Sequence, residues 1–215
     1  MPRSFDCADP GAREEGLAAA AEAIARGALV VLPTDTVYGI ASDAFSPEAV
    51  AALLRAKGRG RDMPVPVLVG SQRTLDGIAH RIGQQARDLV AAFWPGALTV
   101  ICHQAPSLTW DLGDARGTVA VRMPLHPVAL ELLTTTGPLA VSSANVSGQA
   151  PATSLHDAMA QLGDSVEVYL DGGPCQDAVP STIVDVTGER PRLVRAGAVD
   201  VDELRAVVAD LEVAP

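Results

Sequence analysis

Four cationic side chains fall within seven residues of an otherwise acidic chain. Residues 55–61 read Arg-Ala-Lys-Gly-Arg-Gly-Arg, whereas the 215-residue chain has a formal net charge of −10. Lys57 is the single lysine of the chain, beside fifteen arginines. Glycine lets the backbone approach a ligand closely, and ammonium and guanidinium groups are common partners of phosphate. The cluster predicts an anion site, most simply for a polyphosphate. The alternative is a solvated helix end, where cations are also favoured.

Polar side chains gather in four loops at the ends of expected strands. These loops are 34–39, 142–148, 180–182 and 195–197. Ligands of open α/β sheets bind at such loops, although the same residue types also form ordinary turns and caps. Arg122 ends a short apolar run, so it pairs either with a carboxylate of the protein or with one of a substrate.

Signatures of several other site classes are absent from the sequence. It has no Walker A run, no complete Gly-x-Gly-x-x-Gly fingerprint, no Gly-x-Ser-x-Gly elbow and no His-Glu-x-x-His motif. The three cysteines and four histidines show no zinc-ligand spacing. From the residues alone, the chain is an anion-binding α/β protein with hydroxyl-rich loops.

The elements that must position these side chains alternate along the chain. Helices are expected at 12–26, 47–58, 72–93 with a break near Gly83, 127–135, 155–162 and 200–211. Strands are expected at 28–32, 65–69, 98–102, 118–122, 139–141, 166–170, 182–186 and 192–195. This alternation predicts an α/β or α+β sheet with helices packed on it. A flexible segment is expected at 1–11 and a single domain at 12–215.

Composition excludes several settings for the protein. No run is long and apolar enough to cross a membrane, and the first residues do not resemble a signal peptide. Three scattered cysteines favour a reducing cytoplasm over a disulfide framework. A pI near 4.7 disfavours broad, non-specific nucleic-acid binding, which depends on neutralising phosphates.

Six segments together resemble the YrdC-like family of threonylcarbamoyl-AMP synthases, in order and over nearly the whole chain. They are 32–39 (LPTDTVYG), 57–59 (KGR), 94–99 (WPGALT), 121–124 (VRMP), 142–148 (SSANVSG) and 180–185 (PSTIVD). The resemblance implies the single-domain form: a YrdC-like twisted sheet of parallel and antiparallel strands, with flanking helices and an open cationic cleft.

The resemblance also implies a reaction. L-Threonine, bicarbonate or CO2, and ATP with Mg²⁺ give threonylcarbamoyl-adenylate and pyrophosphate. The product would pass to a separate transferase complex that modifies adenosine in tRNA. Cations and Mg²⁺ suit this chemistry, because the attacking carbamate and the leaving pyrophosphate are both anionic.

The resemblance assigns site residues by motif. Lys57 and Arg59 would be catalytic and bind ATP. Further ATP contacts would be Thr118, Ser143, Asn145, Thr153 and Arg195. The threonine contacts would be Thr34, Arg122 and Ser181, and no protein ligand for a metal is identified. The family usually continues from Lys-x-Arg through a proline to Pro-Leu, whereas this chain continues with 60–66 (GRDMPVP), so it stays open whether Arg61 reaches phosphate.

Two alternatives remain at this point. One is an RNA-binding module of the same fold, which the charge of −10 disfavours. The other is a paralogue that acts on a different carbamoyl compound.

Overall fold

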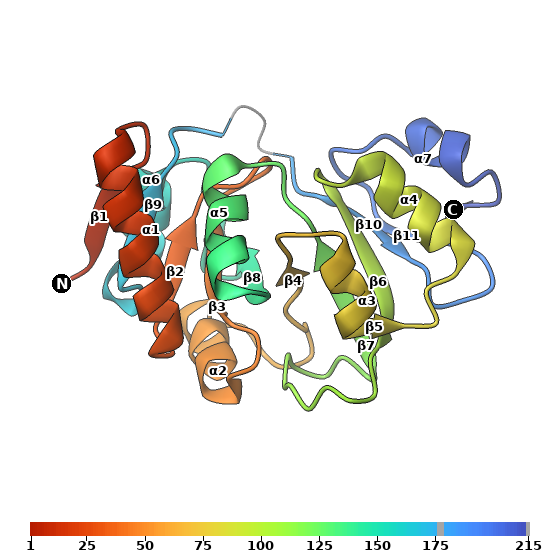
Figure 1. Cartoon of the computed structure of the whole chain (residues 1–215), viewed down its shortest axis with the longest axis horizontal. Coiled ribbons are helices and arrows are strands. Elements are labelled where there is room, and N and C mark those ends of the chain that lie inside the picture. Colours follow the sequence, from red (N-terminus) through yellow and green to blue (C-terminus); the bar gives the residue numbers. More distant parts are fainter. Residues whose placement is uncertain (176–178, 214–215) are drawn as a thin grey trace.

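The computed structural model describes residues 1–175 and 179–213 and contains one mixed sheet with helices packed against it (Figure 1). Its strands are β1 (Arg3–Asp6), β2 (Val30–Leu32), β3 (Gly39–Asp43), β4 (Val67–Leu68), β5 (Ala79–His80), β6 (Leu98–Gln104), β7 (Thr118–Arg122), β8 (Leu139–Ser143), β9 (Val168–Asp171), β10 (Thr182–Asp185), β11 (Arg192–Arg195) and β12 (Glu212–Val213). The spatial order is β1-β9-β2-β3-β8-β4-β7-β6-β10-β11-β12, with β5 paired to β6.

Parallel and antiparallel pairs are interleaved across the sheet. Strand β7 runs parallel to β4 and antiparallel to β6, and β6 runs parallel to β10. This confirms the predicted twisted mixed sheet with flanking helices. The alternation matters for the site, because strands from distant parts of the sequence become neighbours at the centre of the sheet.

Seven α-helices accompany the sheet in the described residues. They are α1 (Pro10–Ala25), α2 (Pro47–Ala56), α3 (Arg73–Ile78), α4 (Gln84–Phe93), α5 (Pro127–Thr136), α6 (Leu155–Leu162) and α7 (Val201–Val207), with a 3-10 turn at Gly163–Ser165. None of these helices is long and apolar enough to cross a membrane.

Local sequence signals account for several helix ends. The side chain of Ser46 accepts a hydrogen bond from the N–H of Ala49, and Pro47 occupies the first turn of α2, as predicted. Asp200 and Glu203 form the predicted capping box of α7. The expected break near Gly83 is also present, since β5 and a short turn separate α3 from α4.

Two apolar clusters hold the helices to the sheet. In one, the alanine-rich face of α1 and one face of α5 pack on β2 and β9, with Ala20, Ala23, Leu132 and Leu170 among its members. Figure 1 shows α1 and α5 side by side over this half of the sheet. The larger cluster includes residues of α2, α4, β6, β7 and β10. Buried alanine removes little side-chain volume from water, but it lets backbones come close.

The expected flexible segment 1–11 needs correction. Arg3–Asp6 forms β1, which pairs in parallel with β9, and α1 begins at Pro10. The side chain of Asp9 caps α1 by accepting from the N–H of Ala12 at 2.7 Å. The first residues therefore belong to the sheet, and the boundary drawn after residue 11 has no counterpart in it.

Besides β1 and the short β5, two further strands were not expected from the sequence. Strand β3 covers Gly39–Asp43, where the small and polar residues after Tyr38 indicated only a loop. The last expected helix, 200–211, ends earlier, at Val207, and strand β12 (Glu212–Val213) follows it. In both cases pairing with a neighbouring strand, β8 for β3 and β11 for β12, outweighs the local preference.

Candidate active site

A cavity of about 430 Å³ lies over one face of the central sheet. Side chains with a period of two along each strand share a face, and Thr99 with Ile101 of β6, and Ala120 with Arg122 of β7, line this cavity. The intervening Val100 and Val121 point into the larger apolar cluster. The loops after β2 and β8, the loop before β10 and the segment 64–66 close the sides.

Three guanidinium groups line the cavity, those of Arg59, Arg122 and Arg195. No carboxylate lines it in the described part of the chain. Burial lowers the pKa of all three guanidinium groups, yet arginine stays charged in proteins. The lining can therefore stabilise negative charge, because it places fixed cations in a partly dry space.

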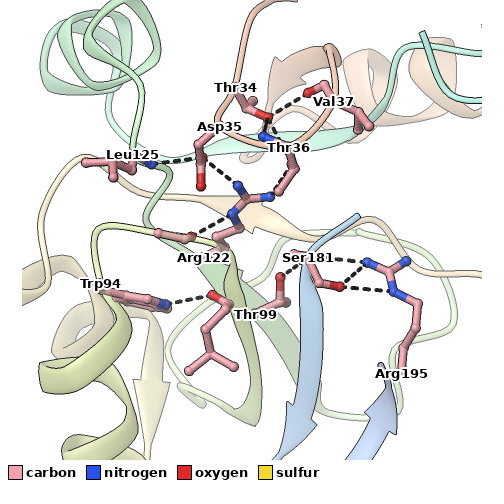
Figure 2. A network of polar contacts seen from close by, with 12 residues as sticks. Thr34, Asp35, Thr36, Val37, Trp94, Thr99, Arg122, Leu125, Ser181 and Arg195 are labelled. Atoms are coloured by element: carbon pink, nitrogen blue, oxygen red, sulfur yellow. Dashed lines mark hydrogen bonds and ion pairs between the residues drawn. The ribbon is translucent and has the colours of Figure 1, made fainter. Parts of the chain in front are cut away.

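Arg122 is held by partners on each of its nitrogens (Figure 2). Its Nε donates to Gly96 O at 2.9 Å, Nη1 to Thr36 Oγ1 at 2.9 Å, and Nη2 to Asp35 Oδ1 at 2.6 Å. The same Asp35 oxygen accepts the N–H of Leu125 at 2.9 Å. Arg122 is only 6% exposed, so this ion pair fixes the guanidinium at the edge of the cavity. The carboxylate pairing considered from the sequence is thus present within the protein.

The loop after β2 carries a chain of hydroxyl groups beside Arg122. Thr34 Oγ1 donates to Val37 O at 2.6 Å and lies 3.1 Å from Thr36 Oγ1. Both threonines are buried and line the cavity. The predicted threonine contact Thr34 therefore lies in the same cavity as Arg122.

Ser181 and Arg195 lie together at another side of the cavity. Arg195 donates to Ser181 O at 3.1 and 2.7 Å and to Ser181 Oγ at 3.1 Å, and Ser181 Oγ lies 2.8 Å from Thr99 Oγ1. Gly197 permits this approach, since a Cβ there would lie 2.6 Å from the carbonyl carbon of Ser181. Thr99 lies on β6, next to the strand β7 that carries Arg122, whereas Ser181 directly precedes β10 and Arg195 ends β11, on the far side of β6 (Figure 2).

Arg59 is the least satisfied of the three arginines. Its Nη1 donates to Ser142 Oγ at 3.1 Å and its Nη2 contacts Pro64 O at 3.4 Å, while the buried Nε has no hydrogen-bond partner in the described residues. Ser143, the residue after Ser142, also lines the cavity. A buried donor without an acceptor is costly, so this corner suits an incoming anion.

Lys57 is not among the residues that line the cavity. Its ammonium donates to Ser143 O at 2.5 Å and to Asn145 O at 2.6 Å, with Asn145 Oδ1 at 3.4 Å. Lys57 is 2% exposed, and burial, followed by the charge of Arg59, lowers its pKa to about 8. The two cations of the lysine-x-arginine pair thus have different surroundings. Arg59 lines the cavity, whereas Lys57 lies outside the lining and donates to the carbonyl oxygens of Ser143 and Asn145.

Of the three remaining candidates, one lines the cavity and two lie outside its lining. Thr118 lines it and donates to Ala115 O at 2.7 Å. Asn145 is buried outside the lining and donates to the carbonyl oxygens of its own loop. Thr153 also lies outside the lining, where its hydroxyl donates to Asp157 Oδ2 at 3.3 Å. The structure therefore brings together seven of the ten predicted site residues in one cavity lining: Thr34, Arg59, Thr118, Arg122, Ser143, Ser181 and Arg195.

Arg61 is engaged elsewhere. It forms a two-pronged ion pair with Asp111, at 2.9 and 2.7 Å, and approaches Asp114 at 3.4 Å. Its side chain is exposed and does not line the cavity. In this structure the altered loop after Arg59 is therefore tied to the connection between β6 and β7.

Three residues of the site were not selected from the sequence. Asp35 and Thr36 lie inside the motif 34–39, and Thr99 ends the motif 94–99, so the matching segments contained the only signal for them. No group of three histidine, cysteine or acidic side chains in the described ranges could hold a metal ion.

The chain is similar to known proteins along most of its length. The family model for Sua5, YciO and YrdC proteins, described as telomere recombination, matches residues 22–197. The chain belongs to this family. The family predicted from the sequence is therefore confirmed.

Two relatives illustrate membership of the Sua5/YciO/YrdC family. A Mycobacterium tuberculosis protein with the provisional name threonylcarbamoyl-AMP synthase is 58% identical over 208 residues, 97% of this chain and 96% of that protein. The threonylcarbamoyl-AMP synthase of Pyrococcus abyssi is 36% identical over 91% of this chain, which spans 58% of that longer protein.

Solved structures of this family match the fold along the full chain. The crystal structure of P. abyssi Sua5 complexed with L-threonine superposes with a TM-score of 0.92 at 32% identity, covering 100% of this chain and 63% of the other. An H234A/Y235A variant of the same protein gives a TM-score of 0.95.

Proposed function

We propose that the chain synthesises threonylcarbamoyl-AMP from L-threonine, bicarbonate or CO2, and ATP, with release of pyrophosphate. One observation carries the proposal: the cavity gathers three guanidinium groups and several hydroxyls with no carboxylate in its described lining. Family members that cover nearly the whole chain carry the name of this synthase. The activity is that of a nucleotidyltransferase.

The chemistry explains such a lining. The threonine amine attacks the carbon of CO2 and loses a proton, which gives a carbamate; when bicarbonate is the substrate, a water molecule leaves in the same conversion. A carbamate oxygen then attacks the α-phosphorus of ATP, and the bond to pyrophosphate breaks. Because attacking and leaving groups are both anionic, cations held in place lower the barrier without a proton-transfer residue.

The contacts support separate parts for the lining residues. We assign the carboxylate of L-threonine to the side of the cavity with Arg122, Thr34 and Ser181. Arg122 uses three of its five N–H donors on acceptors in the described residues, which fixes the guanidinium and leaves two N–H groups for a substrate. A co-crystallised L-threonine in P. abyssi Sua5 supports an amino-acid site in this fold.

We assign the phosphates of ATP to the corner of Arg59 and Ser143, because the Nε of Arg59 has a free N–H there. Thr118 and Arg195 are further candidates for the nucleotide within the lining. For Lys57, Asn145 and Thr153 the assignment to ATP rests on the motifs alone. In the structure Lys57 acts on the site by fixing the carbonyls of Ser143 and Asn145.

Mg²⁺ fits the proposal as a companion of ATP and not as a protein-bound metal. The described residues contain no cluster that could hold it, and no carboxylate lines the cavity. Bound to the phosphates, Mg²⁺ would neutralise part of their charge. Bicarbonate enters as a substrate.

We further propose that the product passes to a tRNA threonylcarbamoyl transferase complex in the cytoplasm. The net charge of −10 argues against tight binding of tRNA by this chain, and the described helices include none that could span a membrane. We also propose that the chain forms a single domain, because one sheet runs through it from β1 to β12.

The test is to measure pyrophosphate release with each substrate omitted in turn. Release that requires L-threonine, bicarbonate and ATP together, with threonylcarbamoyl-AMP identified by mass spectrometry, is expected. ATP cleavage indifferent to threonine would contradict the proposal, and tight tRNA binding at physiological salt without turnover would favour the RNA-binding alternative.

A further inference from the structure

Two pairs of hydroxyl groups line the cavity, and the direction of their hydrogen bonds distinguishes them. In the first pair, Thr34 Oγ1 donates to a carbonyl, Val37 O, so its single proton is used. The contact between Thr36 and Thr34 must then have Thr36 as donor, and Thr36 Oγ1 accepts from Arg122. Both protons of this pair are committed within the protein.

The second pair, Thr99 and Ser181, does not use both of its hydroxyl protons within the described residues. Arg195 can only donate, so Ser181 Oγ accepts from it at 3.1 Å. Ser181 and Thr99 share one proton across their 2.8 Å contact. Neither hydroxyl has a further acceptor in the described part of the chain, and both groups are buried, at 7% and 3% exposed. One O–H of this pair therefore remains available inside the cavity.

We propose that Thr99 is a substrate-binding residue: it and Ser181 form a hydroxyl pair that donates its one uncommitted O–H to a carboxylate oxygen of the amino-acid substrate. This inference rests on the proposed function and adds Thr99 to the site. The donor can come from either member, because the shared proton can shift its direction.

The surroundings of the pair favour an anionic acceptor. The guanidinium of Arg195 lies beside Ser181 and forms no ion pair with a carboxylate in residues 1–175 or 179–213. By contrast, the charge of Arg122 is already met by Asp35. A buried O–H with a cation beside it gains most from a charged acceptor, because hydrogen bonds to charged groups are the stronger class.

The experiment is a double-mutant cycle on threonine binding. Titration calorimetry measures the Kd of L-threonine for the wild-type chain, Thr99→Val, Ser181→Ala and the double variant. Each single variant keeps one free O–H, so we expect its Kd to rise by about threefold at most. The double variant has none, and we expect its Kd to rise by about a hundredfold, more than the product of the single effects.

Controls separate recognition from folding. Thr99→Ser keeps the hydroxyl and should bind threonine within about twofold of wild type. Thr135→Val removes an exposed hydroxyl that bonds only to Glu131 O on α5, and should change nothing. The Kd of ATP and the thermal midpoint should stay close to the wild-type values in the Thr99 variants.

The outcomes are distinct. A double variant that binds like Ser181→Ala, or single effects that simply multiply, would overturn the shared-donor inference while leaving the proposed function intact. Equal losses for L-threonine and the neutral L-threoninamide would also overturn it, because the acceptor would not be the carboxylate. A wild-type chain that binds no threonine would contradict the proposed function and this inference together.

Discussion

The side of the cavity at Arg122 and the corner at Arg59 are built in opposite ways. Each nitrogen of Arg122 donates to a fixed acceptor, and one of these is the carboxylate of Asp35. Arg59 makes one hydrogen bond of 3.1 Å and a weak one of 3.4 Å, and its buried Nε has no partner in the described residues. The Arg122 guanidinium is therefore held in place on every nitrogen before a substrate arrives, whereas the Arg59 guanidinium is held weakly and keeps its Nε donor for an anion.

This difference separates stability from chemistry within one cavity. A satisfied buried network stabilises the fold and fixes geometry, while an unsatisfied buried donor costs stability and marks a functional position. Substitutions near Arg122 should therefore change mainly the free energy of unfolding, whereas substitutions at Arg59 should change mainly the enzymatic activity.

The largest expected effect concerns the Arg122 region. Asp35→Ala leaves a buried guanidinium without its counter-ion, and we expect a loss of about 3–5 kcal/mol in the free energy of unfolding. Urea denaturation measures it. Asp111→Ala, which removes the exposed partner of Arg61, is the matched control and should leave the urea midpoint nearly unchanged. A fully stable Asp35→Ala protein would contradict the contrast.

The next effect concerns Arg59. Arg59→Ala should lower kcat/KM for ATP by about 10²–10³-fold, the usual result of removing one donor to developing negative charge. The thermal midpoint should stay at or above the wild-type value, since an unsatisfied buried N–H is removed. A destabilised but active variant would mean that Arg59 stabilises the fold and does not contact ATP.

A smaller effect concerns Lys57 and pH. Its pKa in the folded chain is about 8, below the ordinary 10.5, because it is buried. Between pH 8 and 10.5 the folded chain therefore binds fewer protons than the unfolded chain, and the free energy of unfolding should rise with pH. Relative to Lys57→Met, the rise should be at most about 1 kcal/mol per pH unit. Urea denaturation at several pH values measures it, and parallel pH profiles for both proteins would contradict it.

Lys57 should affect catalysis in the opposite direction. Above pH 8 the ammonium loses a proton that it donates to the loop after β8. Pyrophosphate release should then fall although the protein becomes more stable. Activity of the wild-type chain that is flat from pH 7 to 9.5 would show that the loop needs no ammonium.

The smallest effect is expected at Arg61. Its partners are exposed and it lies outside the cavity lining, so Arg61→Ala should keep the KM for ATP within about twofold of wild type. A large rise in that KM would mean that Arg61 leaves Asp111 to reach the phosphates.

The sequence determined the features that depend on neighbours along the chain. The cap of α2 at Ser46, the capping box of α7 and strand β7 at 118–122 follow from local patterns and were predicted at or near their observed positions. The motifs at 34–39 and 142–148 identified the loops that border the cavity, and the family assignment followed from six such segments.

Only the tertiary structure decided which side chains meet. Lys57 reaches carbonyls 86 and 88 residues away, Arg61 pairs with Asp111, and Thr99 meets Ser181 across 82 residues. Periodicity fixes the face on which a side chain lies, but not which strand is its neighbour or in what register. The parallel pairing of β6 with β10 sets Thr99 beside Ser181, and that pairing depends on the packing of the whole sheet rather than on either segment.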